Sequence, residues 1–149
     1  MDIKESLYKQ CLDFVDNRLS TVKHAINEIQ ESLTSETKSS VGDKHETGRA
    51  MLQLEREKAG HQLAEIQKTS KTLSKINIEK SSEIIGLGSV VYTTKENYFI
   101  AISAGELHIE NEKFYAISPN TPIGKLLIGK AIKNTIAFRN EKIIINKII

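Results

Sequence analysis

The sequence of 149 residues contains few residues that cross-link or rigidify a small protein, and it has a small net charge. It contains one cysteine, two prolines and a net charge of only +2. The single cysteine, Cys11, excludes an intrachain disulfide and a cysteine-rich zinc site. Because the charge is nearly balanced, a nucleic-acid partner has to be argued from local sites and not from bulk electrostatics.

Long apolar runs are also missing. No stretch reaches the roughly 18 apolar residues that a membrane-spanning helix needs. The N-terminal segment MDIKESLYKQ is charged and lacks the apolar core of a secretion signal. With 39% hydrophobic and 27% charged residues, the composition is that of a globular chain of one ordinary domain or two small ones. We therefore expect a cytoplasmic protein without a membrane partner.

The sequence lacks the glycine motifs of common enzyme families, since it has no P-loop, no GxGxxG and no GxSxG. Its histidines, His24, His45, His61 and His108, show no HExxH or other metal-ligand spacing. Cys11 falls on an apolar helical stripe, so we expect a small buried residue and not a nucleophile. The protein is therefore not predicted to be an enzyme by itself.

Residues 1–76 carry the periodicity of two long helices. Apolar residues recur at steps of three and four from Ile3 to Leu33, and at near-heptad steps from Leu52 to Leu73, with Ser70 as the polar interruption. Each arm of about 30 residues would be roughly 45 Å long. Since a short polar turn separates two arms of equal length, we expect an antiparallel coiled-coil hairpin.

From residue 84 the pattern changes to short runs rich in Ile, Val, Tyr and Phe. The runs are IIGLGSVVYTT, NYFIAISA, KFYAIS, NTIAFRN and EKIIINKII. They predict a small, mostly antiparallel β domain over residues 85–149, after a linker at 77–84, so the expected fold class is α+β. Pro122 is placed to open a short helix that Gly129 ends, and the polar break that starts at Arg139 predicts a closing hairpin.

The turn between the two helical arms reads SSVGDKHETGRA and holds two carboxylates, Asp43 and Glu46, three residues apart. This is the spacing of a capping box, in which both acids serve the first turn of the second helix. The same spacing places two oxygen ligands for a hard cation such as Mg²⁺ on one side of that turn. Two ligands are too few for an autonomous site, so a partner would have to supply the others.

Two separate stretches resemble the bacterial transcript cleavage factors of the Gre family. Gly42–Glu46 (GDKHE) resembles the family's G-D-x-x-E between two helices of matching length. Asn120–Lys130 (NTPIGKLLIGK) resembles its S-P-x-x-x-x-L-(L/I)-G-K segment, which precedes a closing β-hairpin. The resemblance covers nearly the whole chain. It implies an antiparallel coiled coil over residues 1–76, with the acidic tip near 42–46, and a C-terminal domain of FKBP-like fold over residues 85–149.

In that family the coiled coil enters the secondary channel of bacterial RNA polymerase, and the tip acids help to hold the second Mg²⁺ of the polymerase active site. The metal activates water and stabilises charge on the scissile phosphate of backtracked RNA. The resemblance therefore implies a metal role for Asp43 and Glu46, with Mg²⁺ shared with the polymerase and no stable cofactor of the protein's own. Lys44 and Arg49 would lie near phosphates at the RNA 3′ end, and a solvated tip charge is the alternative for each.

The segment Asn120, Thr121 and Pro122 matches the part of the family's C-terminal domain that docks on the polymerase. A plain turn and helix start is the alternative interpretation of these three residues. We expect a monomer, although the same apolar seam could also pair between two chains.

The sequence departs from the family pattern directly after the tip acids. The family commonly continues E-N-A-E-Y, whereas this chain has Glu46-Thr-Gly-Arg-Ala50, with Arg49 in place of a third acid and no aromatic residue. A noncatalytic Gre-like regulator or inhibitor that binds the same channel is therefore the main alternative. A coiled-coil interaction module without any polymerase link is the third. The zinc site of DksA-type channel binders is excluded because the chain has one cysteine.

Overall fold

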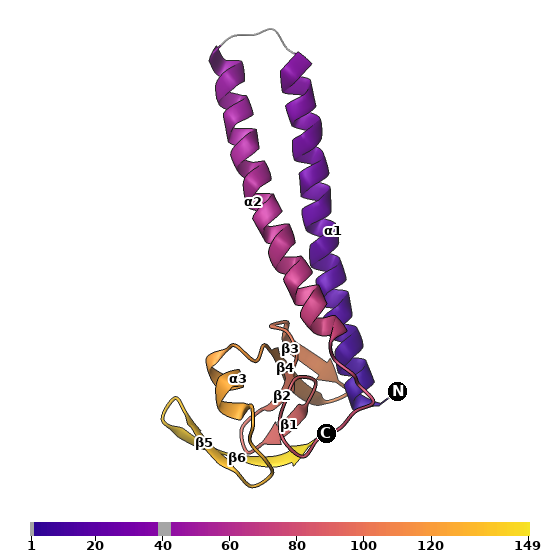
Figure 1. Cartoon of the computed structure of the whole chain (residues 1–149), viewed down its shortest axis with the longest axis vertical. Helices are drawn as coiled ribbons and strands as arrows, with labels where there is room; N and C mark the ends of the chain where they lie inside the picture. The colour runs from indigo at the N-terminus through magenta and orange to yellow at the C-terminus, as the bar shows by residue number, and fades with distance from the viewer. Residues whose placement is uncertain (1, 39–42) are drawn as a thin grey trace. The chain divides into compact units, whose positions relative to one another are not determined.

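The computed structural model describes residues 2–38 and 43–149, and the side chains of all of these except 36–38 and 43–46. Within these ranges, two long helices precede a six-stranded sheet with one short helix (Figure 1). The chain divides into two compact units. The helical unit is Val15–Ser70, and the sheet unit combines Met1–Phe14 with Lys71–Ile149. The division therefore runs through both long helices.

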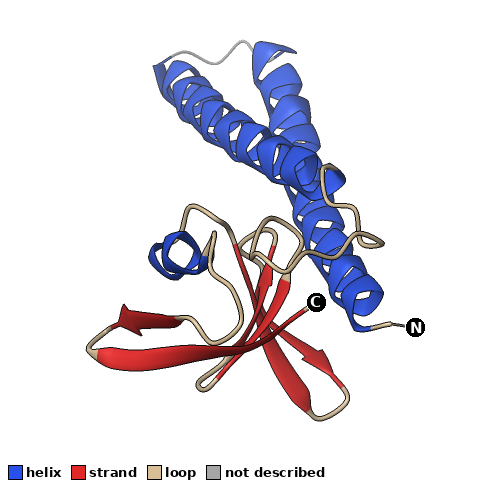
Figure 2. Ribbon diagram, turned by 60° about the horizontal axis from the view of Figure 1, so that its bottom comes forward, coloured by secondary structure: helices blue, strands red, loops and turns tan. Residues whose placement is uncertain are grey.

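The two long helices are α1 (Ile3–Lys38) and α2 (Asp43–Ser74). Asp2 caps α1, because its carboxylate accepts a hydrogen bond from the N–H of Glu5 at 3.1 Å. In the helical unit α1 and α2 lie side by side and run in opposite directions (Figures 1 and 2). The predicted helical hairpin is thus confirmed. No helix in the described part of the chain combines the length and the apolarity that crossing a bilayer requires.

The seam between α1 and α2 follows the predicted stripes with one correction. Ser70 is exposed, and Thr69 is the half-buried residue at that level of α2. The apolar pattern steps seven residues from Leu52 to Ala59 without a residue between them, and the half-buried Arg56 occupies the seam in that interval. At 3.6 residues per turn a straight stripe drifts, so a position chosen by heptad counting alone can miss the seam by one residue.

The strands are β1 (Val90–Thr93), β2 (Asn97–Ile100), β3 (Gly105–Ile109), β4 (Glu112–Ile117), β5 (Thr135–Phe138) and β6 (Glu141–Ile148). They form one mixed sheet in the order β3-β4-β2-β1-β6-β5. The pairs are antiparallel except β2 with β4, which is parallel. A helical hairpin followed by this sheet confirms the α+β fold class.

Strand β3 is the element that the sequence pattern missed. Its segment GELHI carries one buried side chain, Leu107, between polar and half-buried neighbours. An edge strand with one inward residue lacks the run of β-branched and aromatic residues on which strand prediction depends. It nevertheless pairs over five residues with β4, after a tight turn in which Glu110 has φ 53°.

Helix α3 (Pro122–Leu127) and the closing hairpin β5–β6 agree with the sequence. Ile123 and Leu127 of α3 join a buried cluster with side chains of β1, β2, β5 and β6, so α3 covers part of one face of the sheet. Gly129 has φ 83°, as expected of the residue that ends a helix. Arg139 and Asn140 both have positive φ, which is the geometry of the two-residue hairpin turn.

The first turns of α1 belong to the sheet unit because polar groups tie them to the second half of the chain. The Lys4 Nζ donates to the carbonyl oxygen of Lys80 at 2.7 Å, and the Tyr8 hydroxyl donates to that of Leu73 at 3.2 Å. The side chains of Leu7 and Cys11 are fully buried. The linker and the start of α1 therefore fold as part of the sheet unit.

Gln10 of α1 covers part of the β3 edge. Its amide donates to the carbonyl oxygen of His108 at 2.9 Å and accepts from the N–H of His108 at 3.3 Å. One side chain thus makes both bonds that a neighbouring strand would make. Since an open strand edge can pair with another chain, this contact protects the edge.

Candidate functional site

The predicted acidic pair stands at the beginning of α2. The helix begins at Asp43, so Asp43, Lys44 and Glu46 all have helical backbones. Positions 43 and 46 are therefore separated by about one turn and lie on the same side of the helix. Gly42 and the side chains of these three residues lie outside the described part of the structure. The metal pair and the capping box both remain predictions.

Arg49, the residue that departs from the Gre pattern, lies in the second turn of α2. Its side chain is half-buried and takes part in an interaction within the chain. Both expected roles of Arg49, a solvated charge at the tip and proximity to RNA phosphate, remain predictions.

The predicted docking segment forms the N-terminus of α3. Thr121 is the N-cap, and its hydroxyl accepts a hydrogen bond from the N–H of Gly124 at 3.1 Å and donates one to the carbonyl oxygen of Ser118 at 2.7 Å. Pro122 occupies the first helical turn, where its missing N–H costs no hydrogen bond. Asn120 and Pro122 are exposed. Thr121 thus has the structural role of a turn and helix start, and the two exposed residues flank it.

The turn before α3 packs closely against the helix at Gly124. A Cβ atom at Gly124 would lie 2.3 Å from the carbonyl oxygen of Ser118 and 2.8 Å from the hydroxyl of Thr121. The first atom is backbone and cannot rotate away. The close approach of turn and helix therefore requires glycine at this position.

A network of exposed charges on β3 and β4 was not predicted. Glu106 pairs with the Lys113 Nζ at 3.1 Å and with the His108 Nε2 at 3.6 Å. The hydrogen bond from Lys113 lowers the pKa of Glu106, and the same bond raises the pKa of Lys113. Both groups therefore keep their charges at neutral pH, and the network is a charged surface and not an acid–base pair. It was missed because β3 itself was missed.

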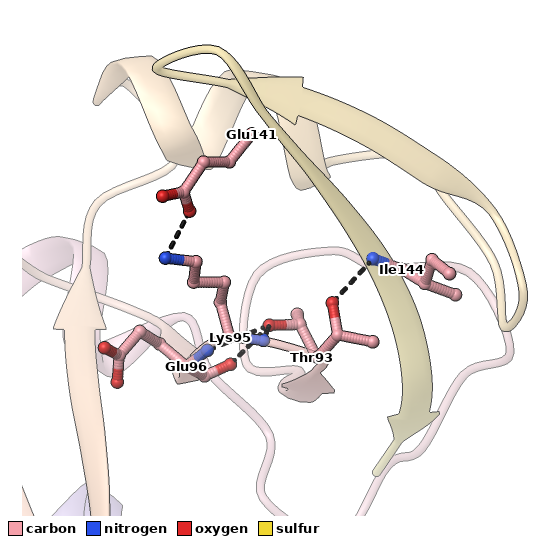
Figure 3. Close-up of polar contacts among 6 residues, drawn as sticks. Thr93, Lys95, Glu96, Glu141 and Ile144 are labelled. Carbon is pink, nitrogen blue, oxygen red and sulfur yellow. Dashed lines mark hydrogen bonds and ion pairs between the residues drawn. The ribbon is translucent and has the colours of Figure 1, made fainter.

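The turn between β1 and β2 is fastened to β6 (Figure 3). The Thr93 hydroxyl accepts hydrogen bonds from the N–H groups of Lys95 and Glu96, each at 3.1 Å, and donates to the carbonyl oxygen of Glu96 at 2.7 Å. The Lys95 ammonium group forms an ion pair with Glu141 at the start of β6. The negative charge of Glu141 is thereby balanced.

The described residues do not assemble a metal site or a catalytic pocket around the histidines and the cysteine. A shallow groove in the helical unit is lined by Asp16, Leu19, Ser20, Lys23, His24 and Asn27, all from α1. The His24 Nε2 lies 3.1 Å from a carboxylate oxygen of Glu28 on the same helix. Among the described residues, no three metal-ligating side chains come together. Cys11 is buried, as expected, and burial raises the pKa of its thiol to about 12, which disfavours the reactive thiolate.

Comparison with solved structures yields a structural neighbour of similar length. No protein-family model and no curated protein sequence matches the chain. The crystal structure of the GreA factor homolog 1 (Gfh1) protein of Thermus thermophilus is similar with 20% sequence identity, 95% of this chain and 93% of that chain covered, and a TM-score of 0.37. Family membership does not follow from a similarity at this level.

Proposed function

We propose that the protein is a Gre-like elongation factor that binds RNA polymerase, inserts its helical hairpin into the secondary channel and stimulates cleavage of backtracked RNA. The observation that carries the proposal is the position of GDKHE. It stands where α2 begins, four residues after α1 ends, so it joins the two arms of the hairpin. The part of α1 that belongs to the helical unit runs from Val15 to Lys38, which is 24 residues or about 36 Å.

The proposed mechanism uses Asp43 and Glu46 as oxygen ligands. Two carboxylates one helical turn apart can hold one side of a hard cation, and the polymerase supplies the remaining ligands. The Mg²⁺ ion would activate water and stabilise charge on the scissile phosphate. In this scheme the chain contributes ligand oxygens and positioning, while the polymerase carries out the bond cleavage.

The sheet unit would hold the protein on the polymerase outside the channel. Asn120 and Pro122 are exposed on either side of Thr121, whose hydrogen bonds are half-buried. Because Gly124 and Thr121 fix the turn, these two side chains are presented on a rigid segment. Rigid presentation lowers the entropic cost of binding.

The test is RNA cleavage in stalled, backtracked elongation complexes with Mg²⁺ and 5′-labelled RNA. Asp43→Asn/Glu46→Gln removes both charges and keeps side chains of the same shape. The matched control, Glu55→Gln/Glu57→Gln, removes two exposed charges farther along α2. We expect shortened RNA with the wild type and the control and none with the tip variant, while all three bind immobilised polymerase.

A noncatalytic regulator is the second candidate because Arg49 replaces an acid of the family pattern. For that protein, neither wild type nor variants would shorten the RNA, yet the wild type would compete with a cleavage-competent Gre factor for polymerase. If no polymerase subunit is retained from a cell extract and no competition is seen, both polymerase functions are wrong and the interaction module remains.

A further inference from the structure

The charges of the chain are unevenly distributed along the sequence. Residues 119–149 hold six lysine and arginine residues and one acid, a net charge of +5. The remaining 118 residues hold 15 basic and 18 acidic residues, a net charge of −3, so the two parts account for the +2 of the whole chain. The small net charge therefore conceals a strongly basic C-terminal segment.

The fold places most of this charge at one edge of the sheet. The basic region comprises Lys125 of α3, Lys130 and Lys133 of the following loop, and Arg139 and Lys142 of the β5–β6 hairpin. Lys147 lies outside it, opposite Tyr92 of β1, with its Nζ 5.4 Å from the centroid of the Tyr92 ring. All are exposed except Lys130, which is half-buried. The strands β5 and β6 lie at one end of the strand order, and α3 contacts β5. The single acid of the segment, Glu141, is paired with Lys95 (Figure 3).

The opposite edge of the sheet is acidic. Strands β3 and β4 and their turn carry Glu106, Glu110 and Glu112 against one basic residue, Lys113. Six strands at about 4.8 Å spacing separate the two edges by roughly 24 Å. This distance exceeds the screening length of about 8–10 Å at moderate salt, so an approaching polyanion experiences the two edges separately. It would be attracted to β5–β6 and repelled from β3–β4.

The basic side chains are available to an anion. Among the described residues, no acid lies within ion-pair distance of Lys125, Lys133 or Lys142. Arg139 lies over the ring of Phe138, with 5.0 Å between its Cζ and the ring centroid, and this contact leaves its charge in place. The exposed side chains of Asn134, Thr135, Asn140 and Asn146 add hydrogen-bond donors of the kind that contact phosphate oxygens.

We infer that the basic region binds the phosphate backbone of a nucleic-acid duplex, independently of any contact with polymerase. Lysine is depleted in protein–protein interfaces, whereas nucleic-acid interfaces are strongly positive, so the composition favours nucleic acid over an acidic protein surface. Single-strand binders stack bases on exposed aromatic rings. None of the phenylalanine and tyrosine side chains in the described structure is exposed, which favours contact with the backbone.

The experiment measures binding of the full chain, without polymerase, to a fluorescently labelled 20-base-pair DNA duplex between 50 and 200 mM salt. The variant Lys125→Gln/Lys133→Gln/Lys142→Gln removes three exposed charges of the basic region. The control, Lys58→Gln/Lys71→Gln/Lys75→Gln, removes three exposed charges from α2 and the residue after it and has the same net charge. We expect the first variant to bind at least tenfold more weakly than the wild type. The plot of log K against log salt should also become shallower, with the magnitude of its negative slope reduced by about 2–3. The control should change affinity less than threefold.

Three results would overturn this inference. The first is no measurable binding at 50 mM salt, and the second is equal weakening in both variants, which would indicate net charge alone. The third is tighter binding to poly-glutamate of matched charge, lost in the first variant, which would identify an acidic protein as the partner. None of these results bears on the tip acids, so the proposed cleavage function is tested separately.

Discussion

The helical unit and the sheet unit are stabilised in different ways. In the helical unit the buried apolar side chains are Val15, Ala59 and Ile66, whereas the sheet unit contains the other twenty of the 23 found among the described residues. Two helices can bury only the stripes that face each other. The sheet unit has α3 against its sheet and encloses a complete core.

The two units therefore differ in how strongly apolar burial stabilises them. The helical unit gains little free energy from burial, since most of its seam is half-buried. Its outer faces are consequently free to carry charge, and its far end is free to carry Asp43 and Glu46. The sheet unit fixes the first turns of α1 through Lys4, Tyr8 and Gln10.

The largest expected effect comes from the same substitution made once in each unit. Ile100→Ala removes a fully buried side chain from β2 and should lower the free energy of unfolding by about 4 kcal/mol. Ile66→Ala in α2, where the thin seam can close around the gap, should cost about 2 kcal/mol. Urea unfolding followed by tyrosine fluorescence and by circular dichroism at 222 nm measures both.

The two signals separate the units because all four tyrosines, Tyr8, Tyr92, Tyr98 and Tyr115, belong to the sheet unit. Helical ellipticity reports mainly on α1 and α2. Ile66→Ala should shift the helical signal more than the tyrosine signal. Equal costs for the two substitutions would show that the helical seam is as well packed as the sheet core, and the comparison between units would fail.

A smaller effect is expected at the start of α3. Gly124→Ala forces a methyl group against the carbonyl oxygen of Ser118 and should cost roughly 2–3 kcal/mol, since the backbone must move. Gly86→Ala is the control, because a Cβ atom there meets no atom within 4 Å. Thermal unfolding of both variants measures the difference. A Gly124→Ala protein as stable as the control would mean that the turn is not rigid, and the rigid presentation of Asn120 and Pro122 would be wrong.

What the sequence could predict depended on whether an element carries a local signal. The hairpin, α3 and β5–β6 follow local signals, such as the apolar stripes, Pro122, Gly129 and the turn at Arg139. Strand β3 has no such signal, because its single inward residue, Leu107, is stabilised by pairing with β4. The contact of Gln10 with His108 joins residues 98 positions apart, which no local pattern reveals.

For the candidate site, too, the sequence predicted the features that depend on local spacing and missed those that depend on three-dimensional contacts. Spacing placed Asp43 and Glu46 at a helix start, and the backbone agrees. The sequence also offered two roles for Thr121, and only the three-dimensional hydrogen bonds to Ser118 and Gly124 show its capping role. The basic region was hidden because a charge count over the whole chain adds the +5 of residues 119–149 to the −3 of the other 118 residues.

A pH-dependent effect is expected at the junction of α1 with the sheet unit. Burial lowers the pKa of Lys4 below its usual 10.5, and the nearby Asp2 charge opposes this effect. The unfolded chain then binds the Lys4 proton more strongly than the folded chain. The contribution of Lys4 to the free energy of unfolding should therefore rise with pH between the lowered pKa and 10.5. The raised pKa of the Cys11 thiol contributes in the opposite direction in all three proteins, so the Lys4 contribution is measured as a difference. The difference in the free energy of unfolding between the wild type and Lys4→Met should change with pH, while the difference between the wild type and Lys9→Met, which removes an exposed lysine, should not. Identical pH profiles for all three proteins would contradict the expectation.

The smallest expected effect concerns the seam of the helical unit, where Thr69 is half-buried and Ser70 is exposed. Thr69→Leu should raise the free energy of unfolding by roughly 0.5–1 kcal/mol, because it adds apolar contact area in a thin seam and removes a hydroxyl that bonds back to the Glu65 carbonyl oxygen. Ser70→Leu exposes its added apolar surface and should give no gain beyond helix propensity, about 0.3 kcal/mol. Urea unfolding followed at 222 nm distinguishes the two. A larger gain from Ser70→Leu would restore the heptad assignment made from the sequence and would place Ser70, not Thr69, between the helices.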